Sequence, residues 1–163
     1  MCITFCDIMI GMRYALRKYS SDDYEFVYQT KKTAYKNYVE ANYGQWDEKV
    51  QREYFDKFID KSKHDIEIIV LGGKAVGFYQ GENLPDGGYE IVNICIIPEY
   101  QNRGIGTQVL KDKIAEHISQ DIRIQYFKQN PVGELYKRLG FEPDGETSTH
   151  FQMIRKAQDG LVK

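Results

Sequence analysis

The sequence lacks any strong excess of charge. Its 163 residues carry 22 lysines and arginines against 24 aspartates and glutamates, which gives a net charge of −2, and like charges do not gather in blocks. Because binding to a nucleic acid depends on concentrated positive charge, we expect no nucleic-acid partner. This charge balance is compatible with a small neutral or cationic substrate.

Cysteine is also scarce. The three residues, Cys2, Cys6 and Cys95, are odd in number, and no cluster of cysteine and histidine has the spacing of metal ligands. The pattern disfavours a disulfide framework or a zinc site, so we expect no metal and a reduced, cytoplasmic location. Cys95 stands between Ile94 and Ile96, which predicts a small buried core residue rather than a nucleophile.

No hydrophobic run is long enough to cross a bilayer. The apolar residues 1–11 also lack the basic start of a signal peptide, so we expect no membrane partner and no targeting signal. Because the first strand pattern begins at Met12, we interpret residues 1–11 as an N-terminal extension and Met12 as a candidate natural start. With a polar tail at 156–163 and no linker or repeat, residues 1–163 are predicted to form a single domain.

Hydrophobic periodicity predicts an α/β fold with a mixed central sheet of about six or seven strands and about four helices. Strands are expected at residues 12–17, on both sides of the Gly72-Gly73 turn, at 89–97, at 122–127 and after residue 141. Helices are expected at residues 21–43, from 47 onward, at 105–119 and at 131–140. Ser21 is the candidate N-cap of the first helix, and Asp47 marks the expected start of the second. The second helix is expected to turn four side chains inward: Val50, Tyr54, Phe55 and Phe58.

The strand at 89–97 is dense in isoleucine and valine, which predicts burial on both of its faces. The segment that follows reads PEYQNRGIGTQ, and it joins this strand to the next helix. A helix start presents unpaired backbone N–H groups that attract phosphate, Gly104 and Gly106 permit close approach, and Arg103 adds positive charge. The alternative is a turn that only begins a helix.

Two familiar phosphate-binding loops are excluded by what this turn lacks. A P-loop ends in Gly-Lys-Ser/Thr, whereas this turn continues as Gly106-Thr107-Gln108. The dinucleotide-binding fingerprint needs a third glycine where this chain has Val109. These mismatches disfavour ATP and NAD as ligands.

Two motifs in this chain resemble the GNAT superfamily of acyl-CoA-dependent N-acyltransferases. The family signature Gln/Arg-x-x-Gly-x-Gly/Ala is present as residues 101–106, QNRGIG. The second landmark is Asn130 followed by LYKRLGF at residues 135–141. The resemblance covers residues 12–154 and implies an acetyltransferase domain with a twisted sheet splayed between its fourth and fifth strands. Acetyl-CoA is then the implied co-substrate, and its pantetheine arm enters the splay.

The resemblance implies a set of CoA-binding residues. The pantetheine arm would pair with the backbone of Ile96 and Ile97 on one side and meet Asn130 on the other. The pyrophosphate would lie on the turn formed by Gln101, Asn102, Arg103, Gly104, Ile105, Gly106 and Thr107. Asn130 is equally well explained as the N-cap of a helix that starts at Pro131.

Two residues are implied to carry the chemistry. Tyr136 corresponds to the family's general acid near the CoA sulfur, although its helix face is apolar enough for a plain core role. Glu90 resembles the glutamate base of the histone-acetyltransferase branch, with a raised pKa expected in an apolar cleft. An ordinary strand-end charge and a water chain as the base remain alternatives. A backbone N–H near Ile96 is the expected oxyanion donor.

We therefore expect an N-acetyltransferase that acts on a primary amine of a small molecule or peptide by direct attack in a ternary complex. The alternative is a non-catalytic acyl-CoA-binding regulatory module. A homodimer is a candidate assembly, since dimers are common in the family. Aromatic and acidic residues of the first two helices would suit a cationic acceptor, or else form core and solvated surface: Tyr35, Tyr38, Tyr43, Trp46, Glu40, Asp47 and Glu48.

Overall fold

Seven strands form one mixed sheet in the order β1-β2-β3-β4-β5-β7-β6 in the computed structural model, which describes residues 13–158. The strands are β1 Ala15–Lys18, β2 Ile66–Leu71, β3 Lys74–Asn83, β4 Tyr89–Ile96, β5 Ile122–Phe127, β6 Glu142–Glu146 and β7 His150–Arg155. The helices are α1 Tyr24–Tyr43, α2 Glu48–Ser62, α3 Ile105–Glu116 and α4 Gly133–Arg138. The predicted α/β fold is confirmed. The proposed extension 1–11, Met12 and the tail beyond 158 lie outside the described residues.

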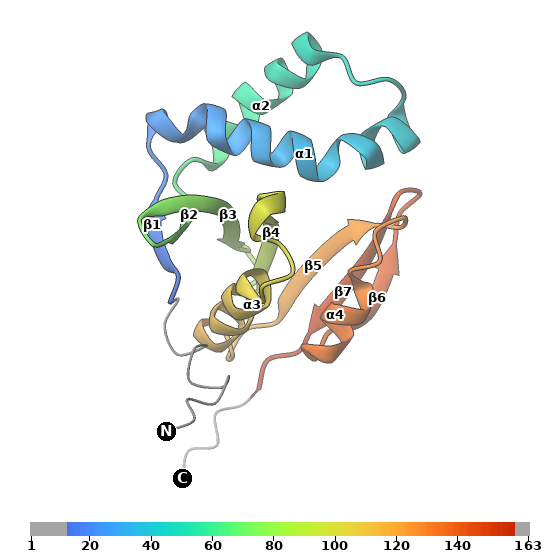
Figure 1. Ribbon diagram of the computed structural model, residues 1–163. Coiled ribbons are helices and arrows are strands. Elements are labelled where there is room, and N and C mark those ends of the chain that lie inside the picture. The colour runs from blue at the N-terminus through green and yellow to red at the C-terminus, as the bar shows by residue number, and fades with distance from the viewer. Residues whose placement is uncertain (1–12, 159–163) are drawn as a thin grey trace, which may run out of the picture.

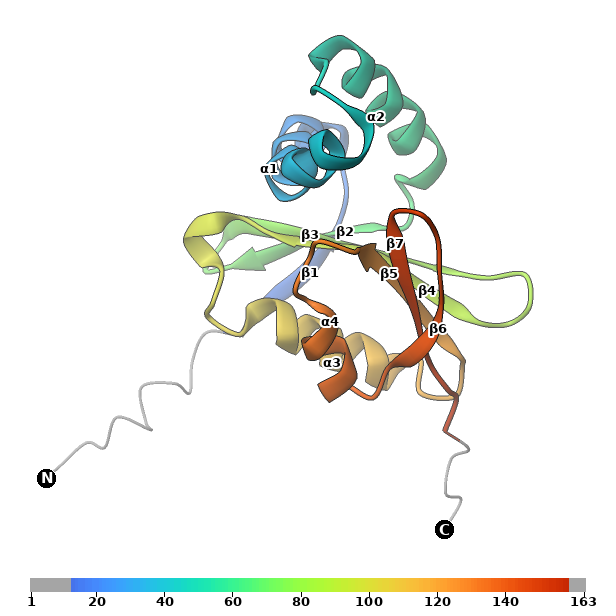
Figure 2. The same ribbon diagram turned by 90° about the vertical axis from the view of Figure 1, so that its right-hand side faces the viewer.

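The helices cover the two faces of the sheet in pairs. Figures 1 and 2 show α1 and α2 on one face and α3 and α4 on the other. Each face has its own apolar core. One cluster joins the sheet to α3 and α4 through side chains such as Ile91, Val109 and Tyr136. The other joins it to α1 and α2 through Val27 and Phe55.

The starts and faces of the first two helices differ in part from prediction. Ser20, not Ser21, opens the first helical turn, since its backbone N–H donates to the Asp23 carboxylate at 2.9 Å. Asp47 caps α2 as expected by accepting from the Val50 N–H at 2.9 Å.

The inward face predicted for α2 is wrong for two of its four residues. Phe55 is buried and Phe58 is half-buried, but Val50 and Tyr54 are 42% and 64% exposed. Residues four apart share a helix face, so Phe55 pairs with the buried Ile59 on the core side, while Val50 and Tyr54 share a face turned to solvent.

The remaining boundaries shift by a few residues. The Gly72-Gly73 hairpin is confirmed, with both glycines at positive φ of 57° and 79° as a tight two-residue turn requires. The helix after the glycine turn ends at Glu116 rather than near residue 119. The last helix begins at Gly133 rather than Pro131.

The sheet opens between β4 and β5, as predicted. These strands pair in parallel only from Tyr89 with Ile122 to Ile91 with Ile124. Beyond Ile91 no pairing joins the two strands in the described chain, and they diverge (Figure 1). The backbone edges that face each other there lack a strand partner.

A β-bulge at Val92 changes which face of the sheet the odd-numbered side chains of β4 occupy. Gly81 pairs with Ile91 and Gln80 with Asn93, so Val92 is the extra residue. Before the bulge, Ile91 packs on the α3 side. After it, Asn93 reaches α1, where its Oδ1 accepts from Tyr35. Burial on both faces is therefore confirmed only in part, because buried and half-buried residues alternate along β4.

Candidate active site

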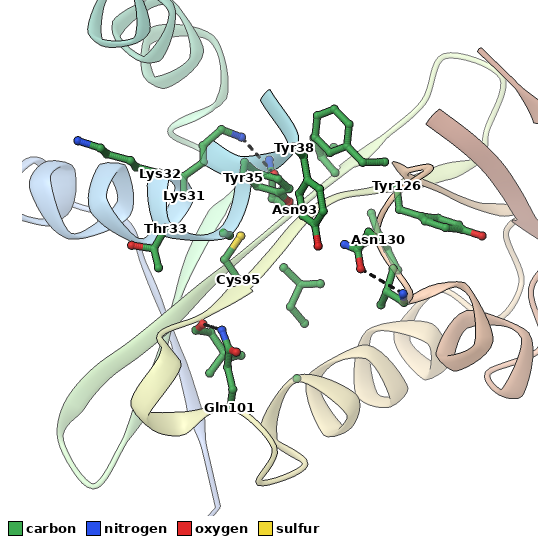
Figure 3. Close-up of a pocket in the computed structure, with 18 of the residues that line it drawn as sticks. Lys31, Lys32, Thr33, Tyr35, Tyr38, Asn93, Cys95, Gln101, Tyr126 and Asn130 are labelled. Atoms are coloured by element: carbon green, nitrogen blue, oxygen red, sulfur yellow. Dashed lines mark hydrogen bonds between the residues drawn. The ribbon is translucent and has the colours of Figure 1, made fainter. Parts of the chain in front are cut away.

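A cavity of about 1030 Å³ occupies the opening between β4 and β5 and extends beneath α1. Most of the predicted site residues line it: Ile96, Gln101, Asn102, Gly104, Ile105, Gly106, Thr107, Asn130 and Tyr136. Three predicted residues do not: Glu90, Ile97 and Arg103. Figure 3 shows side chains from α1, β4, the glycine turn and the segment after β5 converging on this space.

The glycine turn directs backbone N–H groups toward one end of the cavity. Asn102 and Gly104 adopt left-handed conformations with φ of 58° and 79°. Helix α3 then begins at Ile105 without a side-chain cap, and its first backbone bond runs from the Gln108 N–H to the Gly104 carbonyl. The N–H groups at the start of α3 are thus left for a ligand, and together with the helix dipole they form an anion site.

Gly106 lies close against the opened strand. A Cβ built at this position would stand 3.6 Å from Ile96 Cγ1 and 4.0 Å from Ile94 Cδ1. The missing side chain therefore keeps a path open between the turn and β4. A phosphate at the turn and an arm along β4 can belong to one continuous ligand.

The backbone of β4 corrects one predicted contact. The Ile97 N–H donates to the Val76 carbonyl of β3 at 2.9 Å, so Ile97 is not available to a pantetheine amide. Backbone groups alternate in direction along a strand, so those of Ile94 and Ile96 face the opening instead. The Ile96 carbonyl accepts from Gln101 Nε2 at 2.8 Å. Ile94 was missed because its position depends on the register between β3 and β4.

Arg103 does not line the cavity. Its guanidinium donates to the Glu99 carbonyl at 2.8 Å and lies 4.9 Å from the centre of the Tyr100 ring. The arginine thus braces the turn from outside, and its charge stands beside the anion site.

Asn130 organises a turn and lines the cavity, and its contact with the pantetheine arm stays a prediction. Its Oδ1 accepts from the Val132 N–H at 3.1 Å, which organises the turn before α4, and the residue also lines the cavity (Figure 3). It is not an N-cap next to a helix starting at Pro131, because α4 begins two residues later.

Tyr136 is both a core residue and a wall of the cavity. It is only 6% exposed, and its ring packs edge-on against Tyr126 with centroids 5.5 Å apart. Burial, with smaller effects from Cys95 and Tyr126, raises the pKa of its hydroxyl well above the usual range. The phenol therefore keeps its proton at neutral pH, as a general acid must.

Glu90 lies in the paired part of β4, below the opening. Its register partners are Glu82 on β3 and Arg123 on β5. Burial raises the pKa of its carboxyl, Glu82 adds to the rise, and Arg123 opposes it. A raised pKa was expected, but Glu90 does not line the cavity, so it has no direct contact with that space.

A polar cluster beneath α1 was missed by the sequence analysis. Asn93 Oδ1 accepts from Lys31 Nζ at 3.2 Å and from the Tyr35 hydroxyl at 3.1 Å, while Asn93 Nδ2 donates to Gln80 Oε1 at 2.6 Å. Asn93 and Gln80 are 6% and 2% exposed. The signal was present, since Asn93 interrupts the apolar run from Ile91 to Ile97.

The part of the cavity formed by α1, α2 and their connection, where the acceptor is expected, is aromatic but not acidic. Tyr35, Tyr38 and Trp46 line the cavity as expected, whereas Tyr43 is 63% exposed and does not. The expected carboxylates are absent from the lining and have other partners. Glu40 accepts from the Trp46 backbone, Asp47 caps α2, and Glu48 accepts from Lys32, Tyr28 and Trp46.

The sheet opens between two parallel strands, and a turn with free N–H groups lies beside the opening. This arrangement is typical of the class of proteins that bind a phosphate-bearing arm along a strand edge. The comparisons with known proteins give this class its family. Residues 63–143, about half of the chain, match the model of the acetyltransferase (GNAT) domain. The chain belongs to the GNAT superfamily of N-acetyltransferases.

One curated relative is a Bacillus subtilis (strain 168) protein assigned as a ribosomal protein bS18-alanine N-acetyltransferase. It is 28% identical over 80 residues, which cover 45% of this chain and 50% of the relative. The match thus spans about half the length of that protein, and it leaves the acceptor of the present chain open.

Solved structures share the whole fold at low sequence identity. The Corynebacterium glutamicum structure described as histone acetyltransferase HPA2 and related acetyltransferase has a TM-score of 0.71 at 16% identity, covering 93% of this chain and 100% of that one. The PaiA N-acetyltransferase of Thermoplasma acidophilum, solved with coenzyme A, has a TM-score of 0.65 at 20% identity, covering 89% and 99%.

No helix within residues 13–158 combines the length and apolar character needed to cross a membrane. The same residues contain no group of three or more histidine, cysteine, aspartate or glutamate side chains that could hold a metal ion.

Proposed function

We propose that the protein transfers an acetyl group from acetyl-CoA to a primary amine of a small molecule or peptide, by direct attack within a ternary complex. The observation that carries this proposal is the continuous opening from the start of α3 to the edge of β4. The turn at 101–107 would hold the pyrophosphate, and the backbone of Ile94 and Ile96 would pair with the pantetheine amides.

The reaction requires a neutral amine, a donor to the oxyanion, a proton donor for the thiolate and a base for the amine proton. The neutral amine nitrogen attacks the thioester carbonyl carbon, and a backbone N–H near Ile96 stabilises the oxyanion that forms. The carbon–sulfur bond then breaks, the thiolate takes a proton from the Tyr136 hydroxyl, and the amine nitrogen gives up its proton to a base. Tyr136 suits its step by position, because it lines the cavity, and its hydroxyl carries a proton at neutral pH.

The base is proposed as Glu90 acting through water. Because Glu90 does not line the cavity, a proton from the amine would reach its carboxylate only by way of water molecules. Its raised pKa makes it a better proton acceptor than an ordinary exposed glutamate. A water chain that ends elsewhere is the competing route.

The test is thiol release from acetyl-CoA with a panel of amines, with mass spectrometry of the products. The proposal predicts a gain of one acetyl group on an amine and a matching amount of free CoA. Binding of CoA without turnover on a broad panel would favour the alternative, a non-catalytic acyl-CoA-binding module. Absence of CoA binding would overturn both. The cytoplasmic location and a homodimer stay predictions.

A further inference from the structure

The acceptor side of the cavity carries positive charge, contrary to the expectation of carboxylates. Within residues 13–158 its lining contains no aspartate or glutamate, but it contains Lys31, Lys32 and His150. The Lys32 ammonium is paired with Glu48 at 2.7 Å. Burial lowers the pKa of His150, which favours its neutral form. Among these three residues, Lys31 is therefore the one that can offer an unpaired positive charge to a ligand in the cavity.

Lys31 is held among aromatic rings and one neutral amide. Its Nζ lies 3.2 Å from Asn93 Oδ1, 5.0 Å from the centre of the Tyr35 ring and 4.7 Å from that of Phe58. No ion pair joins it to a carboxylate in the described chain, and burial lowers its pKa. Figure 3 shows its ammonium turned toward Asn93, whereas Lys32 extends away.

The position of this ammonium is set by the fold. Asn93 is fixed by its hydrogen bond to the buried Gln80, and the bulge at Val92 turns Asn93 toward α1. A half-buried cation that has no carboxylate partner within the described chain is stabilised when an anion arrives. Lys31 also lies outside residues 63–143, the part that matches the family model, so this feature is separate from the shared donor half.

We propose that the acceptor carries an acidic group, a carboxylate in an amine of the amino-acid type, and that Lys31 binds it. This inference rests on the proposed function and names the substrate class of the same site. The rings of Tyr35 and Phe58 would pack against the apolar part of the acceptor. A positive charge nearby also lowers the pKa of an amine, which favours the neutral form that attacks, whereas carboxylates would do the opposite.

The experiment compares amino acids with their amides, using leucine with leucinamide and phenylalanine with phenylalaninamide. Each pair matches in shape and differs in charge. We expect kcat/KM to favour the acid by about 10- to 100-fold, the size of a charge-assisted hydrogen bond. An amide's amine loses its proton more readily than that of the free acid, so amine reactivity alone predicts the reverse order.

Variants separate the charge of Lys31 from other roles. Lys31→Met should abolish the preference for the acid, and Lys31→Arg should keep part of it. Lys36→Met is the matched control, since Lys36 lies on the same helix but outside the cavity lining, and it should leave the acid-to-amide ratio unchanged. Affinity for CoA and the melting temperature are measured for each variant to exclude damage to the fold.

The outcomes are distinguishable. Amides that react as well as acids, or a Lys31→Met variant that keeps the preference, overturn the inference while leaving the proposed function intact. Equal loss in Lys31→Met and Lys31→Arg with an unchanged ratio identifies a base instead and also overturns it. The inference is also overturned if Lys31→Met changes the preference between acetyl-CoA and succinyl-CoA but not the preference between acid and amide acceptors. No thiol release with any amine overturns the proposed function itself.

Discussion

Replacing Tyr136 with phenylalanine removes one hydroxyl and keeps the ring. The ring packs against Tyr126 and Phe141, with centroids 5.5 Å and 6.0 Å away, and these contacts survive the change. No hydrogen bond of the hydroxyl is found within residues 13–158, so the free energy of unfolding should change by less than about 1 kcal/mol. Loss of a general acid should lower kcat by about 10²- to 10⁴-fold, or about 2.7 to 5.4 kcal/mol of barrier.

The assay is thiol release under saturating acetyl-CoA, with CoA affinity measured separately by calorimetry. Affinity should stay within about twofold, because the hydroxyl is assigned to the leaving sulfur and not to binding. Tyr14→Phe is the matched control. It removes a hydroxyl that bonds to Asp112 outside the cavity, and kcat should not change. An unchanged kcat in Tyr136→Phe would refute the reasoning and leave Tyr136 as a core residue.

Three further changes test other parts of the account. Glu90 must be ionised to accept a proton, so activity should fall as pH drops through its raised pKa, and Glu90→Gln should remove that acid limb from the pH profile of kcat/KM. If the limb persists, the proton leaves by another route. Gly106→Val should weaken CoA binding at least about tenfold in calorimetry, because its branched side chain fills the path beside Ile96, while the melting temperature is retained. Unchanged affinity would place the ligand elsewhere. Asp23 has a lowered pKa, chiefly from its hydrogen bonds with Arg17, so its contribution is present above the unfolded pKa of about 3.9 and is lost as pH falls through the folded value. Asp23→Asn should thus cost about 1 to 3 kcal/mol in urea unfolding at pH 7 and progressively less as the pH falls below about 4, and a cost that does not change with pH would contradict the linkage.

The donor half of the site could be predicted because its signals are local. A strand, a turn with Gly104 and Gly106 and a helix start follow one another in the chain, and local sequence is sufficient to place their N–H groups together. The family resemblance predicted wrongly that the backbone of Ile97 is open to the pantetheine arm. Which backbone groups face the opening depends on the register between β3 and β4, and the partner strand sets this register.

The acceptor half could not be predicted because it forms between distant elements. Lys31 and Asn93 meet only because α1 lies across β4 and the bulge at Val92 shifts the Asn93 side chain to the sheet face that α1 covers. Glu90 stands before that bulge, in the closed part of the sheet. Its resemblance to the glutamate base of the histone-acetyltransferase branch had placed it in the cleft. The inward face of α2 was wrong in part, because the sheet packs against the side that carries Phe55 and Ile59 and leaves Val50 and Tyr54 exposed.

The central claim is that the opening between β4 and β5 receives acyl-CoA, and a crystal structure with bound CoA tests it most directly. The account predicts the pyrophosphate within hydrogen-bond distance of the N–H groups at Ile105, Gly106 and Thr107. It also predicts the pantetheine paired with the backbone of Ile94 and Ile96, and the sulfur beside the Tyr136 hydroxyl. CoA bound at another surface, or an opening that stays free at saturating CoA, would contradict the claim.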